Sequence, residues 1–330
     1  MTQVQGPPPG TTLVEESPGS GSGSRSGSGS GSGSGRGRRR GDPAPKVKLG
    51  PGRWFREVGW RHVVGVIAVI WALFPVSYLL SASLNPLGNV VTSTLIPQSF
   101  SLTNFTTLLD EQPFGTWARN SLIVCVSVVF VQLLFSALAA FAFSRFRFTG
   151  RRGGLLALLL IQMFPQFLAA VALYLMFTDI GEVIPAIGLD TLAGYILVMC
   201  GGSLGQVWLI KGFFDSIPMS LDEAAMLDGA SHVQIFFRII LPLVRPILAV
   251  CGLLVFVGVI GEFLMASIFL RDSGNKTLAT GLYGLIDADR SNNLGVFAAG
   301  SILTAIPVVL LFLYLQKFII GGVTSGGVKG

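Results

Sequence analysis

Residues 119–143 read RNSLIVCVSVVFVQLLFSALAAFAF, and this stretch decides the fold class. The hydrocarbon core of a bilayer is about 30 Å thick, and a helix of about 20 predominantly apolar residues crosses it. From Ser121 to Phe143 the sequence contains no Asp, Glu, Lys or Arg. A helix that is apolar all round belongs in lipid or in a buried core. The stretch therefore predicts a membrane-spanning helix.

Apolar runs of similar length lie on both sides of this one. The predicted spans cover approximately residues 62–84, 119–143, 154–177, 192–211, 246–270 and 297–320. Over the 330 residues, 51% are apolar and 12% charged, and the mean hydropathy is +0.68. We expect an all-α polytopic membrane protein whose six transmembrane helices occupy residues 61–320, because a soluble enzyme needs about twice this share of charged residues.

The two ends of the chain have a different composition. Residues 1–60 contain a Gly-Ser repeat from Gly19 to Gly35, an arginine cluster and scattered prolines, which predicts a disordered tail and a juxtamembrane segment. Its basic residues favour contact with anionic membrane lipid over nucleic acid. The Gly-rich residues 321–330 predict a second tail, of extended conformation.

The distribution of Lys and Arg predicts the orientation. With residues 1–61 placed inside, 19 of the 23 Lys and Arg lie in segments on the inner side and four on the outer side. Positively charged residues accumulate on the cytoplasmic side of membrane proteins. Both termini are therefore predicted to be cytoplasmic.

The sequence does not contain the sets of residues that common catalytic and metal sites require. Cys125, Cys200 and Cys251 fall inside apolar runs, and the only histidines, His62 and His232, are 170 positions apart. The segment 274–277, Gly-Asn-Lys-Thr, does not have the GxxxxGK[ST] spacing of a phosphate-binding loop. We expect no cofactor or metal bound by this chain, and a membrane-embedded enzyme is disfavoured.

Residues 216–245 differ from a simple connection between spans. Ser220 to Glu223 and Ser231 to Gln234 each match the capping box that starts a helix. Gly229 lies between them and can adopt the positive φ that ends a helix. We predict two short helices joined by a bend. The first should expose Ala224, Ala225 and Met226, and the second should pack against the membrane helices.

This loop carries a resemblance to a known family. Glu223-Ala224-Ala225, then Gly229, then Ile239-Ile240-Leu241-Pro242 resembles the EAA loop of binding-protein-dependent ABC importer permeases. The resemblance implies that the loop is a cytoplasmic coupling helix that docks in a cleft of a separate ATPase subunit. It assigns ATPase coupling to Glu223, Ala224, Ala225, Gly229, Ile239, Leu241 and Pro242. ATP and magnesium would bind to that partner.

Other segments are similar to MalG-type permeases of maltose and maltodextrin systems. They are residues 162–165, 208–212, 270–272 and 316–330. The resemblance implies a bacterial cytoplasmic-membrane importer with a second, MalF-like permease, an ATPase homodimer and an extracytoplasmic sugar-binding protein. A different cargo of the same family (another oligosaccharide, trehalose or glycerol phosphate) stays open, and so does an ion-coupled secondary transporter.

Two groups of polar residues are candidates for contact with the cargo or its binding protein. Glu262 is the only carboxylate inside a predicted span, so it should face the translocation path or a partner subunit, or else bond a neighbouring helix. Gln162 and Gln166 flank Pro165, where a kink could open a polar cavity. In the resembling family the outer loop, residues 271–296, faces the binding protein. Its candidates are Asp287, Asp289, Asn292 and Asn293.

Overall fold

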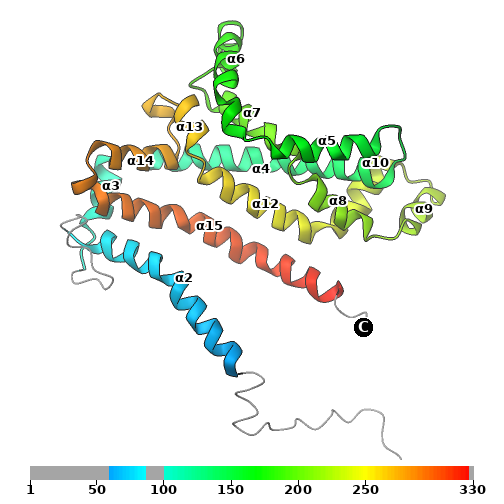
Figure 1. Ribbon diagram of the computed structural model, residues 1–330, viewed down its shortest axis with the longest axis horizontal. Helices are drawn as coiled ribbons and strands as arrows, with labels where there is room; N and C mark the ends of the chain where they lie inside the picture. The colour runs from blue at the N-terminus through cyan, green and yellow to red at the C-terminus, as the bar shows by residue number, and fades with distance from the viewer. Residues whose placement is uncertain (1–58, 87–99, 327–330) are drawn as a thin grey trace, which may run out of the picture. The chain divides into compact units, whose positions relative to one another are not determined.

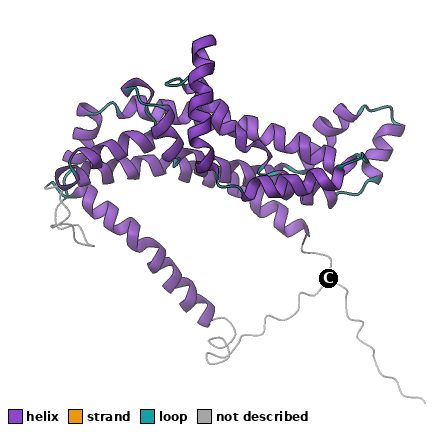
Figure 2. Ribbon diagram, turned by 45° about the horizontal axis from the view of Figure 1, so that its top comes forward, coloured by secondary structure: helices purple, strands orange, loops and turns teal. Residues whose placement is uncertain are grey.

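The computed structural model describes residues 59–86 and 100–326, and every regular element in these residues is helical (Figure 2). Most of the predicted N-terminal tail and the last four residues lie outside this part of the chain. The longer helices are α2 (Trp60–Leu84), α3 (Thr103–Glu111), α4 (Phe114–Arg145), α5 (Arg151–Met163), α6 (Ala170–Val183), α7 (Leu192–Cys200), α8 (Val207–Asp215), α9 (Ser220–Leu227), α12 (Arg245–Ile260), α14 (Leu278–Ala288) and α15 (Arg290–Gly326). The shorter helical elements are η2 (Gln166–Ala169), η3 (Pro185–Ile187), η4 (Gly201–Leu204), α10 (His232–Gln234), η5 (Ile235–Ile240), α11 (Leu241–Leu243), α13 (Leu264–Phe269) and η6 (Ser273–Asn275).

Helix α4 packs against more of the described elements than any other helix does. It contacts α12, α8, α7 and α14, and α12 in turn packs along α15 (Figure 1). One apolar core gathers around Trp117, Val128 and Phe256, and a second around Phe141, Phe214 and Phe236. Helix α2 buries only Ser81, Ala82 and Ser83 near its end, and its large apolar side chains are exposed, as expected of a surface that faces lipid.

Three predicted spans are continuous helices of sufficient length and hydropathy. They are α2, α4 and residues 292–318 of α15. Two others are pairs of helices: α5 and the following helix are bent by 79° at Pro165, and α7 with η4 is bent by 43° from α8. With the bent pairs counted as single spans, the described residues supply up to six.

The fifth predicted span differs most from expectation. Helix α12 ends at Ile260, ten residues before the end of the predicted run, and the short α13 follows after a break. Sixteen residues of helix rise only about 24 Å, which is short of the hydrocarbon thickness. At its N-terminal end, α12 follows the helical residues 232–243, whose axis is bent by 78° from that of α12. These residues extend its apolar stretch.

Polar residues of α4 stabilise the break between α7 and α8. Gln132 Nε2 donates to the carbonyl of Met199 over 2.8 Å, and the Ser136 hydroxyl donates to the carbonyl of Ser203. These bonds satisfy carbonyls that leave the α-helical pattern. A Cβ on Gly202 would lie 3.1 Å from Gln132 Nε2, so glycine here permits the close approach of α4.

The C-terminal prediction is wrong over residues 321–326. Helix α15 continues to Gly326, where an extended tail was expected. This one helix starts at Arg290, includes Pro307 and ends with the Gly-rich residues 321–326. Helix propagation from an existing turn is far easier than nucleation, so a glycine-rich end can extend a long helix.

Candidate functional site

The first helix of the predicted coupling loop starts one residue earlier than expected. Helix α9 runs from Ser220 to Leu227, and its N-cap is Met219, which makes no side-chain capping bond. Ser220 is therefore inside the helix, and the predicted capping box at Ser220 and Glu223 is wrong. The carbonyl of Met219 accepts the amide of Glu223 over 3.1 Å, so the backbone begins the helix without the serine hydroxyl.

The bend and the second helix start are confirmed. Gly229 has φ +83°, in the region that favours glycine. Two residues later, the Ser231 hydroxyl accepts the amide of Gln234, and the Gln234 side chain accepts the amide of Ser231 in return. This capping box fixes the point at which the chain re-enters a helix.

The second helix packs inward, as predicted. Ile235, Phe236 and Ile240 are buried, and the Phe236 ring meets the Phe141 ring of α4 at 5.1 Å. Ile239, Leu241 and Pro242 are half-buried. Residues Ile235–Ile240 form a π-helix, which the apolar spacing did not indicate. A π-helix has a wider turn than an α-helix, so its apolar side chains point in a different direction than α-helical spacing predicts. The apolar face continues up to the bend that precedes α12.

Helix α9 has one outward and one inward face. Glu223 and Ala224 are exposed, and Leu227, at the end of the helix, is 89% exposed. Ala225 is 8% exposed and belongs to the second apolar core, so the expectation that it lies on the outer surface is wrong. Asp222 shares the inward face because residues three apart in a helix point the same way.

An ion pair that the sequence reasoning missed ties this inward face to a membrane helix. Arg145, the last residue of α4, places Nε 2.7 Å from Oδ2 of Asp222, and both side chains are at least nine-tenths buried. Burial raises the pKa of the Asp222 carboxyl, although the Arg145 charge acts to lower it. The sequence signal for this pair is an arginine directly after an apolar span.

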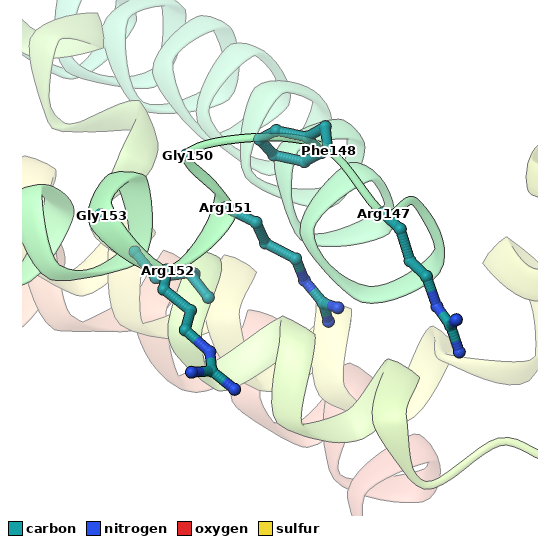
Figure 3. Close-up of a pocket in the computed structure, with 7 residues that line it drawn as sticks. Arg147, Phe148, Gly150, Arg151, Arg152 and Gly153 are labelled. Carbon is teal, nitrogen blue, oxygen red and sulfur yellow. The ribbon is translucent and has the colours of Figure 1, made fainter.

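The turn that follows Arg145 and the start of α5 carry three more arginines around a hollow of about 590 Å³ (Figure 3). Arg151 donates from Nε to the carbonyl of Phe143 over 2.7 Å and so caps the end of α4. Gly150 has φ +88° and turns the chain into α5. Arg147 and Arg152 are exposed. The coupling loop therefore lies beside a strongly basic turn.

Glu262 accepts three hydrogen bonds from the described part of the chain. Its carboxylate accepts the Tyr195 hydroxyl over 2.7 Å and the amides of Met265 and Ala266 over 2.8 and 2.9 Å. The last two bonds satisfy the free amides at the start of α13, which explains why the predicted fifth span breaks at this point. The bond from Tyr195 agrees with the predicted role of bonding a neighbouring helix.

The two glutamines lie on either side of a break and not of a kink within one helix. Helix α5 ends at Met163, Phe164 and Pro165 are extended, and Gln166 starts η2. A proline disfavours helical conformation in the residue before it, which accounts for the extended Phe164. The Gln162 side chain is exposed. The three described donors to Glu262 are Tyr195, Met265 and Ala266, and Gln162 is not among them.

The predicted outer loop is mostly helical. Asp287 is exposed near the end of α14, and Asp289 separates α14 from α15. Asn292 donates from its side chain to Asp289 over 2.8 Å, and Asn293 donates to the carbonyl of Leu285 over 2.9 Å. The four candidates thus meet at one turn, where three of them are engaged in holding the helix ends.

Comparison with known proteins agrees with this architecture. Residues 132–323 match the family model "Binding-protein-dependent transport system inner membrane component". The maltose/maltodextrin transport system permease protein MalG of Vibrio vulnificus is 40% identical over 279 residues, covering 79% of this chain and 94% of that protein. MalG of Escherichia coli K12 is 39% identical, covering 82% and 95%. The maltodextrin permease protein MdxG of Bacillus subtilis is 39% identical, covering 70% and 82%.

A solved structure shares the fold. A bacterial ABC transporter that imports the acidic polysaccharide alginate superposes with a TM-score of 0.66 at 23% identity, covering 82% of this chain and 98% of that one. The family model matches more than half of the chain, and the MalG proteins match nearly their whole length. The chain therefore belongs to the inner-membrane permease components of binding-protein-dependent ABC transport systems, and it is an all-α, polytopic membrane protein.

Proposed function

We propose that this permease imports maltose or maltodextrin-like sugars across the bacterial cytoplasmic membrane. The energy comes from ATP and magnesium bound in an ATPase homodimer. A second, MalF-like permease and an extracytoplasmic sugar-binding protein complete the assembly, and both termini of this chain face the cytoplasm. Identity near 40% to MalG and MdxG proteins over most of the chain supports this cargo.

The observation that carries the proposal is the two-faced helix α9. Its inner face is anchored by Asp222 and Ala225, while Glu223, Ala224 and Leu227 face outward. A short helix with small and apolar side chains on its free face fits a groove in a partner protein. Gly229 and the Ser231 capping box set its angle to the rest of the loop.

Alternating access follows from this attachment. Closure of the ATPase dimer on ATP would draw the coupling helices of the two permeases together. Because α9 is fixed to α4 and α4 packs on α12, this displacement would reach the membrane helices. The two permeases would then rock from an inward-open to an outward-open arrangement as rigid bodies.

Reconstituted transport tests the proposal. The tagged chain is purified from native membranes with its partners, placed in proteoliposomes and supplied with sugar-loaded binding protein. We expect uptake of labelled maltotriose only with ATP and magnesium, undiminished when proton and sodium gradients are dissipated. Uptake driven by an ion gradient without ATP would contradict the proposal. Competition by unlabelled trehalose, glycerol phosphate and other oligosaccharides compares the alternative cargoes directly.

A further inference from the structure

The pair formed by Arg145 and Asp222 connects the end of the longest central helix to the coupling helix. Arg145 lies in the last turn of α4, and Asp222 lies in the first turn of α9, 77 positions later in the chain. Helix α4 packs on α12, α8, α7 and α14. A displacement of α9 therefore has a direct polar contact through which it can act on α4.

Arg145 holds the start of α9 at three successive points. With the Asp222 carboxylate it forms an ion pair in which, among the described residues, Nε makes no hydrogen bond. The guanidinium donates to the carbonyl of Ile217 over 3.2 Å and to the sulfur of Met219 over 3.3 Å. Met219 is the N-cap residue and supplies no side-chain capping bond. The planar, multiply donating guanidinium thus fixes both the position and the direction of the first turn.

Stability alone does not account for this pair. Within the described residues, the second carboxylate oxygen of Asp222, Oδ1, accepts no hydrogen bond. Burial raises the pKa of Asp222 despite the nearby guanidinium. A raised pKa means that the ionised carboxylate is less favourable in the folded than in the unfolded chain, so its contribution to stability falls as the pH rises through that pKa. Buried ion pairs often add little net stability over apolar residues of similar size.

We propose that Arg145 and Asp222 form the joint that transmits motion between α9 and α4. Both are positioning residues: they set where the outer face of α9 meets the ATPase, and neither needs to touch ATP or sugar. This inference rests on the proposed function. It explains why a costly charge pair lies where the coupling helix meets the end of a membrane helix.

The double substitution Arg145→Met with Asp222→Leu tests the joint in the complete transporter. Apolar replacement of a buried pair usually keeps the fold, so the complex should assemble with its ATPase and unfold within a few degrees of the wild type. The joint loses its directional contacts. Sugar-stimulated ATP hydrolysis and uptake should therefore fall about tenfold or more, by analogy with the cost of misplacement by about 1 Å at other sites that depend on position.

Two further variants separate positioning from folding. Asp222→Asn keeps an oxygen that can accept from Arg145, and it should retain at least half of the wild-type coupling. Lys211→Met removes an ion pair, Lys211 to Asp215 at 2.5 Å, that lies within the single helix α8, and coupling should be unchanged.

The outcomes are distinct. Wild-type coupling in the double variant would overturn the inference that Arg145 and Asp222 transmit motion. It would leave the proposed function intact. Loss of assembly or a large loss of thermal stability in both the double variant and Asp222→Asn would also overturn it, because the pair would then serve the fold. A wild-type complex that shows no ATP-dependent uptake would overturn the joint together with the proposed function.

Discussion

The hydroxyl of Tyr195 lies 2.7 Å from the carboxylate of Glu262 and donates to it from a helix 67 positions earlier in the chain. The same carboxylate accepts two amides at the start of α13. Tyr195 is 1% exposed and Glu262 is half-buried, so the bond is largely shielded from solvent. The carboxylate thus joins α7 to the break between α12 and α13.

Substitutions at this carboxylate should follow a clear order. Tyr195→Phe removes one bond to a charged group, at a cost of about 1.5–3 kcal/mol. Glu262→Gln should cost more, since its amide retains only one acceptor oxygen. Glu262→Lys should fail to assemble, because it has no acceptor for the amides of Met265 and Ala266. Thermal unfolding in detergent and membrane yield measure the order. Glu182→Lys, at an exposed position, is the control, and a Glu262→Lys protein as stable as that control would contradict the bonding role.

Two glycines of α14 should respond oppositely to the same substitution. A Cβ on Gly281 would lie 2.2 Å from Cδ2 of the buried Trp117 indole, whereas a Cβ on Gly284 meets only Lys276 Nζ at 4.0 Å. Gly281→Ala should destabilise the protein by about 1–3 kcal/mol or more through overpacking. Gly284→Ala should be neutral or slightly stabilising. Equal unfolding temperatures for the two variants would show that α14 does not pack on α4 as described.

Gly229→Val isolates the bend of the coupling loop. Apart from its chain neighbours, no atom of the described residues lies within 4 Å of the Cβ position, so the cost is the backbone penalty of positive φ, about 1–2 kcal/mol. That is too little to unfold the membrane helices, but it re-aims α9. The variant should reach the membrane and lose ATPase binding or sugar-stimulated ATP hydrolysis. Gly229→Asn should be milder because asparagine tolerates this region.

The matched control for this bend is Gly212→Ala in α8. Its Cβ also meets nothing within 4 Å, but its φ is not positive. Transport by this variant should equal that of the wild type. If Gly229→Val transported equally well, the bend would have no part in coupling.

The sequence predicted the helices better than their breaks. Hydropathy located all the apolar runs because apolar residues need no partner to prefer lipid. It could not locate the break after Ile260, which depends on Glu262 accepting amides three and four positions later and a hydroxyl from Tyr195. Nor could it show that Ser136 and Gln132 of α4 bond the carbonyls between α7 and α8. Such contacts join residues far apart in the chain.

In the coupling loop too, the sequence predicted features set by neighbouring residues and missed those set by contacts with distant ones. Local rules predicted the positive φ of Gly229 and the Ser231 capping box, since both depend on neighbouring residues. The Ser220 box failed because Arg145 holds the start of α9 from outside the loop. Ala225 was placed on the wrong face for a related reason: its neighbours in the core come from other helices. Tertiary contacts override local preferences when a short helix has few residues of its own to decide its position.

Site-directed crosslinking from Leu227 tests docking of α9 on the ATPase most directly. The cysteines Cys125, Cys200 and Cys251 are first replaced by alanine, and a single cysteine is placed at Leu227, which is 89% exposed. Val183, at 81% exposure and on the predicted outer side, is the matched control. In the assembled transporter we expect Leu227→Cys to form an adduct with the ATPase subunit and Val183→Cys to form none. Equal adducts from both positions, or none from Leu227 in a complex that transports sugar, would contradict the assignment of α9 as the coupling helix.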